Sequence, residues 1–129
     1  PSGKRIVIDL SDQQLKMVEN NRVISVRDVS TGKWSTPTPV GEYKTRNKIQ
    51  TAYSKPYNLY MEYWMAFTND GSYGLHSLPY WRLAGGGKLY EGGGHLGTPG
   101  SHGCIRQSLD EAKSLFAWAP VGTPVIITK

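Results

Sequence analysis

The sequence predicts a mostly β protein with one amphipathic helix near its C-terminal end. Two observations predict this class. Short runs of alternating or β-branched residues recur between turn residues up to residue 77, and the apolar spacing changes to a helical period only after residue 108. The chain has 129 residues, of which 38% are hydrophobic, and this is enough to bury one core but not two. We therefore expect a single domain spanning residues 1–129.

The N-terminal part is expected to form three strands, at residues 5–10, 14–19 and 22–29. Asn20 and Asn21 separate the second run from the third. Asparagine tolerates the positive φ angles that a two-residue hairpin turn requires. The sequence therefore predicts an antiparallel meander at the start of the domain.

The middle of the chain alternates a loop with further strands. Residues 30–41 are rich in Ser, Thr, Gly and Pro, which is typical of a loop, and a short strand is expected near residues 42–45. The aromatic run at residues 59–68 favours a central strand, and residues 73–77 favour the next strand after an Asn-Asp-Gly turn. This assignment places His76 at the end of a strand.

The C-terminal part contains the one predicted helix. Its apolar residues recur at helical spacing, and Ser108 with Glu111 forms a capping box at its start. We expect the helix to end near Pro120 and Gly122, before a buried strand at residues 123–128. The residues expected on its apolar face are Leu109, Ala112, Leu115, Phe116 and Ala119.

Charge and hydropathy argue against nucleic-acid binding and against a membrane span. The net charge is +5 and the pI is about 9.4, but the 15 Lys and Arg residues are scattered and form no basic run. This pattern argues against a nucleic-acid-binding protein. The sequence contains no run of eighteen apolar residues and no secretory signal at its start, so we expect no membrane span.

Cys104 is the only cysteine in the sequence, and it is a core residue, a metal ligand or a nucleophile. The polar and small residues before it, Ser101, His102 and Gly103, are unlike the apolar neighbours of a core cysteine. Gly103 allows the backbone to approach a ligand closely, and amides near Cys104 are suited to binding a developing oxyanion. The motif therefore favours a nucleophile.

A cysteine nucleophile needs a base near neutral pH, because a free thiol titrates at about 8.5. Three histidines are candidates: His76, His95 and His102. His102 would share a face with Cys104 on an extended backbone, but His76, at a strand end where a backbone carbonyl can orient its ring, is the better placed base. Three histidines and one cysteine also make a tetrahedral zinc set, but no CxxC or HExxH spacing supports it, so no metal is expected.

The motif and its surroundings resemble a known family. Ser-His-Gly-Cys-Ile-Arg at residues 101–106 follows Gly-Leu-His-Ser at 74–77 and precedes the capped helix and Gly-Thr-Pro-Val-Ile-Ile at 122–127. Together with Ser-Thr-Gly-Lys at 30–33 and Thr-Pro-Thr-Pro-Val-Gly at 36–41, these segments resemble the catalytic domain of the L,D-transpeptidases, cysteine-dependent enzymes that cross-link peptidoglycan. The resemblance covers nearly the whole chain and implies a β sandwich with a helix packed against it.

The resemblance also implies roles for individual residues. Cys104 would be the nucleophile and His76 the general base, with the backbone carbonyl of Ser77 holding the His76 ring. The amides of Gly103 and Cys104 would form the oxyanion hole. The other motif residues would shape the pocket and order the loop: His102, Gly103 and Ser101.

Arg106 lies two residues after the cysteine, where many members of the family have Asn. Its planar, permanently charged guanidinium is suited to holding a substrate carboxylate in a bidentate hydrogen bond. The alternative is a structural salt bridge to an acidic residue of the chain. We expect Arg106 to bind substrate.

The region between His76 and Ser101 is longer than the family's usual spacer, so we expect an inserted glycine-rich loop or lid at about residues 78–99. Two glycine triplets, at residues 85–87 and 92–94, would be its hinges. Its apolar residues would seat on the site, and a flexible surface loop is the alternative. The residues concerned are Trp81, Leu89 and Tyr90, and the insertion leaves His95 without a family role.

The implied reaction consists of two acyl transfers. Cys104 would attack the L,D amide after the third residue of a stem tetrapeptide, release D-alanine, and pass the acyl group to an amine. The implied partners are peptidoglycan stem peptides and carbapenem-type β-lactams, without a metal or organic cofactor, in the periplasm or cell wall. The alternatives are an L,D-carboxypeptidase of the same fold, a sortase-like transpeptidase, whose Thr-Leu-x-Thr pattern is absent, a zinc-binding wall hydrolase and a non-catalytic wall-binding module.

Overall fold

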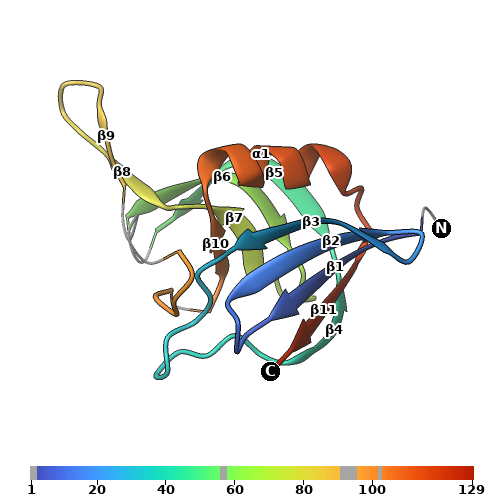
Figure 1. The fold of residues 1–129 in the computed structure, drawn as a ribbon. Coiled ribbons are helices and arrows are strands. Elements are labelled where there is room, and N and C mark those ends of the chain that lie inside the picture. Colours follow the sequence, from blue (N-terminus) through green and yellow to red (C-terminus); the bar gives the residue numbers. More distant parts are fainter. Residues whose placement is uncertain (1–2, 56–57, 91–95, 102) are drawn as a thin grey trace.

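A computed structural model describes residues 3–55, 58–90, 96–101 and 103–129. Two β-sheets pack against each other, and one helix lies across the top of both in the view of Figure 1. The first sheet has five strands in the order β3-β2-β1-β11-β4. Its strands are β1 (Lys4–Asp9), β2 (Gln14–Glu19), β3 (Arg22–Asp28), β4 (Gly41–Lys44) and β11 (Pro124–Thr128).

The second sheet has six strands and carries the histidine and cysteine segments that the sequence singled out. Its order is β10-β7-β6-β8-β9, with β5 paired to β6 outside this path. Its strands are β5 (Asn47–Ser54), β6 (Leu59–Ala66), β7 (Gly74–Ser77), β8 (Tyr80–Arg82), β9 (Lys88–Tyr90) and β10 (Ile105–Gln107). The structure therefore confirms the predicted mostly β sandwich with one helix.

The core lies between the two sheets because each contributes its alternate residues. Ile6 and Ile8 of β1 are buried completely, and the parallel strand β11 adds Val125 and Ile127 at the matching positions. Met65 of β6 and Leu75 of β7 come from the second sheet and belong to the same core cluster. The period-2 alternation of the strands thus fills one shared interior.

Helix α1 (Leu109–Trp118) closes one end of the sandwich. The Ser108 side chain accepts a hydrogen bond from the Glu111 backbone amide, so the predicted N-cap is confirmed. Ala112 and Leu115 are buried against the sheets. The placement of Leu109 on the apolar face is wrong: this residue is 41% exposed, because the buried face begins at Ala112, one turn further along.

The hairpin between β2 and β3 also agrees with the prediction, since Asn20 and Asn21 have φ angles of 53° and 67°. Four strands were not predicted: β5, β8, β9 and β10. The segment at residues 78–99, expected to be a loop, instead contains the antiparallel pair β8 and β9, in which Trp81 lies opposite Leu89. This hairpin projects from the body of the domain in Figure 1.

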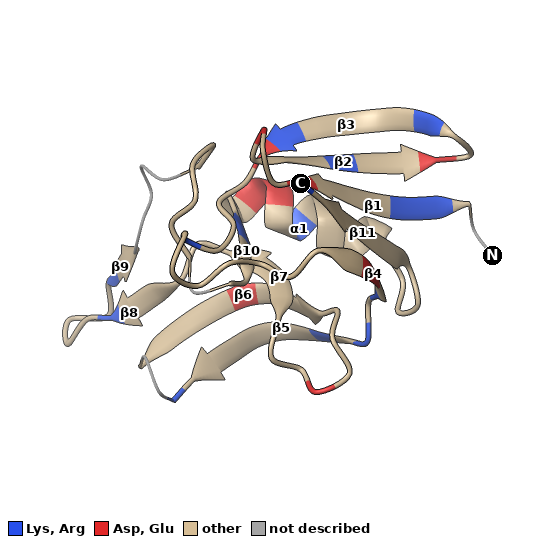
Figure 2. Ribbon diagram, turned by 90° about the horizontal axis from the view of Figure 1, so that it is seen from below, with Lys and Arg blue, Asp and Glu red and all other residues tan. Residues whose placement is uncertain are grey.

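Charged residues are spread over both sheets. Figure 2 shows the Lys and Arg residues on separate strands, in line with the scattered pattern of the sequence. Among the residues that the structure describes, no helix is long and apolar enough to cross a membrane.

Candidate active site

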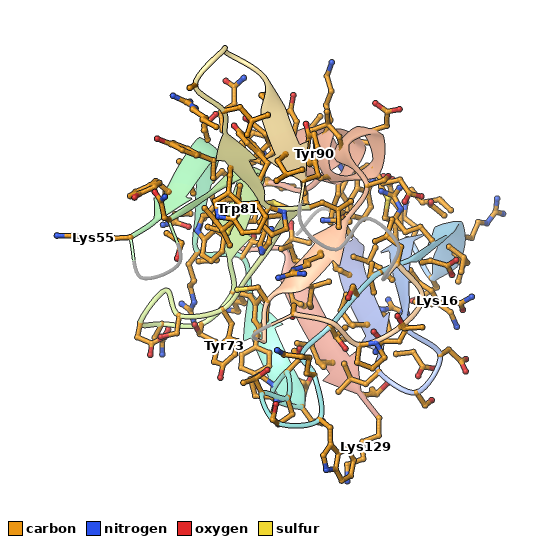
Figure 3. The ribbon with its side chains drawn as sticks, turned by 90° about the vertical axis from the view of Figure 1, so that its left-hand side faces the viewer. Lys16, Lys55, Tyr73, Trp81, Tyr90 and Lys129 are labelled. Carbon is orange, nitrogen blue, oxygen red and sulfur yellow. The ribbon has the colours of Figure 1, made fainter. Side chains whose placement is uncertain are left out.

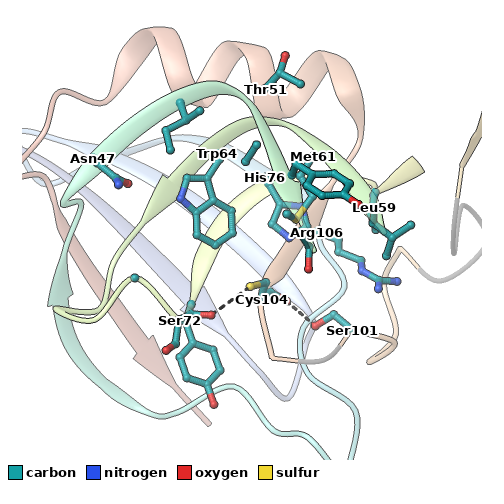
Figure 4. A pocket seen from close by; sticks show the side chains of 17 residues that line it. Asn47, Thr51, Leu59, Met61, Trp64, Ser72, His76, Ser101, Cys104 and Arg106 are labelled. Atoms are coloured by element: carbon teal, nitrogen blue, oxygen red, sulfur yellow. Dashed lines mark hydrogen bonds between the residues drawn. The ribbon is translucent and has the colours of Figure 1, made fainter. Parts of the chain in front are cut away.

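A cavity of about 730 Å³ lies on the second sheet and contains the predicted nucleophile and base. Its walls come from β5, β6 and β7, from the loop before β7, and from the segment that leads into β10. Figure 4 shows the lining side chains gathered around Cys104. The lining residues nearest to the chemistry include Trp64, Ser72, Tyr73, His76, Cys104 and Arg106.

Strand register explains why these residues meet. Ile49 of β5 lies opposite Trp64 of β6, and Arg106 of β10 lies opposite His76 of β7. The β6–β7 register, with Met65 opposite Leu75, places Trp64 and His76 opposite each other one position further along. Ile49, Trp64, His76 and Arg106 therefore form one row across four strands, and all four line the cavity.

A backbone carbonyl holds the His76 ring in the orientation and tautomer that a neutral base requires. Its Nδ1 lies 2.5 Å from the carbonyl oxygen of Ser77, which can only accept, so the proton is assigned to Nδ1 and the lone pair to Nε2. Burial lowers the pKa of His76 to about 4, the Ser77 hydrogen bond acts against this shift, and the charge of Arg106 adds to it. At neutral pH the imidazole is uncharged and can accept a proton.

Cys104 directly precedes β10 and is partly buried. Its Sγ lies 3.8 Å from the carbonyl oxygen of Ser72, a contact drawn in Figure 4. Burial raises the pKa of the Cys104 thiol, while a backbone hydrogen bond from Gly74 and the charge of Arg106 act in the opposite direction. Both shifts favour the neutral forms, a thiol at Cys104 and an imidazole at His76, and the two groups line the same cavity.

The Ser101 side chain orders the loop that carries the cysteine. Its Oγ donates a hydrogen bond of 2.5 Å to the carbonyl oxygen of Cys104 and accepts one of 3.0 Å from the Gly103 amide. Gly103 has a φ of 126°, and a Cβ at this position would collide with the Tyr73 ring. Both the conformation and the contact with Tyr73 explain why glycine stands before the cysteine.

The Ser- and Thr-rich segment before β4 holds this loop in place by hydrogen bonds. The Lys33 amide donates to the Ser101 carbonyl at 2.9 Å, and the Thr38 hydroxyl donates to the Gly103 carbonyl at 2.6 Å. Ser30 and Arg106 exchange two backbone hydrogen bonds. The sequence pattern predicted only a loop here, and it gave no signal that Thr38 supports the cysteine loop, because that contact joins residues 65 positions apart.

Arg106 is almost completely buried, with 3% of its surface exposed, and it lines the cavity. Its charge lowers the pKa of both His76 and Cys104. It is therefore close enough to bias the protonation of both groups.

The structure keeps the predicted lid residues away from the cavity wall. Trp81, Leu89 and Tyr90 lie on the β8–β9 hairpin and are not among the lining residues, and Figure 3 shows Trp81 and Tyr90 apart from the pocket residue Tyr73. The glycines at residues 85–87 form the turn at the tip of this hairpin, where the Leu83 amide donates to the Gly87 carbonyl. This triplet therefore lies at the end of the hairpin away from the body of the domain, and its role as a hinge stays a prediction.

Several predicted positions lie outside the described residues: His95, His102 and the second glycine triplet at 92–94. Within the part of the chain that is described, no three His, Cys, Asp or Glu side chains are grouped to hold a metal ion. Trp64 and Thr38 are the residues of this site that the sequence did not reveal, since each is recognised only from its partner on another segment.

Comparisons with known proteins agree with this geometry. Residues 3–127 match the family model YkuD, described as the L,D-transpeptidase catalytic domain. A Bacillus subtilis protein named "Putative L,D-transpeptidase YqjB" is 30% identical over 99% of this chain and 73% of its own length.

Solved structures show the same fold. An L,D-transpeptidase from Stackebrandtia nassauensis is 29% identical, with a TM-score of 0.79 over 98% of this chain and 56% of that one. L,D-transpeptidase 3 from Mycobacterium tuberculosis, in complex with a faropenem-derived adduct, is 21% identical, with a TM-score of 0.78 over 98% of this chain and 60% of that one. The chain thus spans little more than half the length of these solved proteins. On the family match over nearly its whole length, the chain belongs to the L,D-transpeptidase catalytic-domain family.

Proposed function

We propose that the chain is a peptidoglycan L,D-transpeptidase in which Cys104 is the nucleophile and His76 the general base. One observation carries the proposal: Cys104 lines the same cavity as a buried, neutral His76 whose Nδ1 is tied to the Ser77 carbonyl. A neutral thiol paired with a neutral base is suited to acyl transfer, because the base removes the proton as the sulfur attacks.

The first half-reaction forms a thioester. The Cys104 Sγ attacks the carbonyl carbon of the L,D amide after the third stem residue, and its proton passes to Nε2 of His76. The amides of Gly103 and Cys104 are proposed to bind the developing oxyanion. When the C–N bond breaks, the imidazolium returns the proton to the leaving amine of D-alanine.

The second half-reaction resolves the thioester. An amine of a second stem attacks the thioester carbon, His76 takes a proton from that amine, and the Cys104 thiolate leaves and is reprotonated. Water in place of the amine would give a carboxypeptidase with the same residues. Arg106 is proposed to hold a carboxylate of the donor stem, because it is the cationic side chain among the described lining residues.

The family also suggests inhibitors and a location. The Mycobacterium tuberculosis relative carries a faropenem-derived adduct, and we propose that β-lactams of the carbapenem type acylate Cys104 in the same manner. A peptidoglycan substrate implies the periplasm or cell wall as the place of action. We also propose that the inserted segment at about residues 78–99 acts as a cover over the site, which favours transfer of the acyl group to an amine over hydrolysis by water.

Mass spectrometry of the reaction tests this function. The protein is incubated with a defined disaccharide tetrapeptide, and we expect loss of D-alanine together with a cross-linked dimer. Incubation with a carbapenem should add one drug mass to Cys104. Cys104→Ala, a partly exposed loop position, should keep the fold and lose both reactions. Turnover by a folded Cys104→Ala protein would refute the assignment, and a hydrolysed tripeptide without dimer would identify the carboxypeptidase.

A further inference from the structure

Trp64 lies directly against the proposed base. It sits on β6 opposite His76 on β7, and the two rings are stacked with centroids 5.7 Å apart and planes inclined by 22°. Figure 4 shows Trp64 and His76 side by side above Cys104. The indole is partly exposed and lines the cavity, whereas the imidazole is 2% exposed. Trp64 therefore covers part of the His76 ring at the cavity wall.

The two contacts of His76 restrain different movements. The hydrogen bond from Nδ1 to the Ser77 carbonyl lies in the plane of the ring and fixes the tautomer. It does not prevent the ring from tilting about that bond. The stacked indole covers one face of the ring and opposes this tilt. The two restraints together leave Nε2 with one direction.

The surrounding backbone is adapted to the position of the indole. Tyr63, the residue before Trp64, has a φ of 55° in the middle of β6, although tyrosine rarely adopts left-handed backbone in a strand. The strand register passes from Ile49–Trp64 to Thr51–Glu62 without a pair at this residue. The Tyr63 ring packs on Phe116 of α1, with centroids 5.4 Å apart, which holds the unusual conformation.

Gly74 makes room for the same indole. A Cβ on Gly74 would lie 2.7 to 2.8 Å from three carbon atoms of the Trp64 ring, which is closer than van der Waals contact allows. The chain thus uses a left-handed tyrosine on one side and a glycine on the other to seat this ring. Backbone strain retained beside a reacting group is typical of a functional constraint.

We propose that Trp64 is a positioning residue for His76, which holds the imidazole plane and keeps water away from it. The proposal rests on the proposed function only for its kinetic consequence. The orientation, tautomer and hydration of His76 are properties of the free protein and are measured without any substrate.

Nuclear magnetic resonance of the His76 ring nitrogens tests the proposal directly. In the wild-type chain we expect a single Nδ1-protonated tautomer and a titration midpoint well below that of an ordinary histidine. Trp64→Leu should admit water, mix the two tautomers and raise the midpoint by at least one pH unit, because burial is the main cause of the low value. Trp64→Phe keeps an aromatic face and should retain most of the wild-type behaviour.

Trp118→Leu is the matched control. Trp118 lies on α1, where its indole donates to Glu19, so its loss removes an equally large aromatic side chain away from the cavity. We expect this variant to lose stability without changing the His76 spectrum. If Trp64→Leu, folded as judged by its amide spectrum, keeps the single tautomer and an unchanged or lower midpoint, the proposal is overturned.

Acylation kinetics give the functional readout. The rate of acylation by a carbapenem, followed against pH, should be about tenfold lower or more in Trp64→Leu, with its acidic limb moved to higher pH and the change largely reversed in Trp64→Phe. If the wild-type chain is not acylated at all, the proposed function fails, but the ring-nitrogen spectra still decide the role of Trp64. An unchanged rate profile in Trp64→Leu would overturn the positioning role alone.

Discussion

The hydroxyl group of Thr38 donates a hydrogen bond of 2.6 Å to the carbonyl oxygen of Gly103. That carbonyl belongs to the peptide unit whose N–H is the amide of Cys104. Thr38 is itself oriented by the Gly32 amide, which donates to its Oγ1 at 2.8 Å. Because a peptide unit is planar, fixing the oxygen also fixes the direction of the N–H on the other side. A buried threonine thus sets the direction of a proposed oxyanion donor.

Thr38→Val should therefore slow acylation strongly in a protein that still folds. Valine keeps the shape but leaves the Gly103 carbonyl without its donor, which allows the peptide unit to rotate. We expect acylation by a carbapenem to slow by about tenfold to a hundredfold, since removal of a whole oxyanion donor costs about 10² to 10³. Stopped-flow measurement of adduct formation would give this rate.

Thr45→Val is the control for this prediction. Thr45 is buried to the same degree, donates to the Pro120 carbonyl at 2.9 Å and accepts from the Thr123 amide, so it repeats the hydrogen bonds of Thr38 outside the cavity lining. Both variants should lose about 1 to 3 kcal/mol of unfolding free energy. Equal acylation rates in the two variants would show that Thr38 is only structural.

Much of the fold could be predicted because its signals are local. The alternation of β1 and β2, the Asn20-Asn21 turn and the Ser108 cap are each encoded within a few residues. β5 escaped prediction because most of its residues are exposed, and its partner β6 determines its position. β10 has only three residues, and its pairing with β7 joins segments about thirty positions apart.

The site could be predicted in part for the same reason. Cys104 and His76 were found from short motifs, and the structure brings them to one cavity. Trp64 belongs to an aromatic run that predicted only a strand, and its contact with His76 depends on the register between β6 and β7. The hairpin formed by β8 and β9 was predicted as a loop because three glycines interrupt its pattern, although they form its turn.

The free energy of unfolding should decrease as the pH falls from about 6.5 to about 4. The pKa of His76 is lowered by burial to about 4 in the folded protein, whereas an unfolded histidine titrates at about 6.5. The unfolded chain therefore binds more protons in this window, and protons favour it. Above pH 6.5 both states hold a neutral ring, so the stability is fully present there.

Urea denaturation at a series of pH values measures this dependence. His76→Asn should flatten the curve between pH 4 and 6.5, because the group that titrates there has been removed. Hydrogen bonds from Ser11 and Ser72 lower the pKa values of Asp9 and Asp70, respectively. These two carboxyl groups therefore titrate below this window, and both remain in the variant. Parallel curves for the two proteins would contradict a buried, neutral His76.

The reaction of Cys104 with iodoacetamide should distinguish a neutral thiol from a preformed thiolate. Burial raises the pKa of Cys104, so we expect the alkylation rate to be low at pH 7 and to keep rising beyond pH 9. Free cysteine under the same conditions is the control, and its rate should level off earlier. A rate for Cys104 that is already constant below pH 7 would indicate a thiolate–imidazolium pair instead.

Arg106→Lys should raise the substrate concentration needed for half-maximal rate more than it lowers the melting temperature. Lysine keeps the charge that lowers the pKa of His76 and Cys104, but it loses the planar pair of donors that binds a carboxylate. Steady-state kinetics with a tetrapeptide would show this as a higher KM. A large fall in melting temperature with an unchanged KM would favour the structural salt bridge.

The glycines at the tip of the β8–β9 hairpin should be replaceable, with one exception. Gly86 has a φ of 91°, which an alanine adopts only with strain, whereas Gly85 and Gly87 have no such angle and only ordinary contacts or open space around a Cβ. Gly85→Ala with Gly87→Ala should leave the protein as stable as before or stabilise it by up to about 1 kcal/mol, because alanine restricts the unfolded chain. Gly86→Ala should destabilise the turn and is the matched comparison.

The same pair of variants tests whether this turn is a hinge. The base of the hairpin is fixed, since the Tyr80 hydroxyl donates to Glu62 at 2.5 Å and the Tyr80 ring stacks on Tyr60. Because the glycines lie at the opposite end, stiffening them should not change the ratio of hydrolysis to transfer when a tetrapeptide donor is offered an amine acceptor. Mass spectrometry of the products gives that ratio. A clear rise in hydrolysis in the Gly85→Ala, Gly87→Ala protein would contradict this expectation. It would show that bending at the glycine turn is needed to protect the thioester from water.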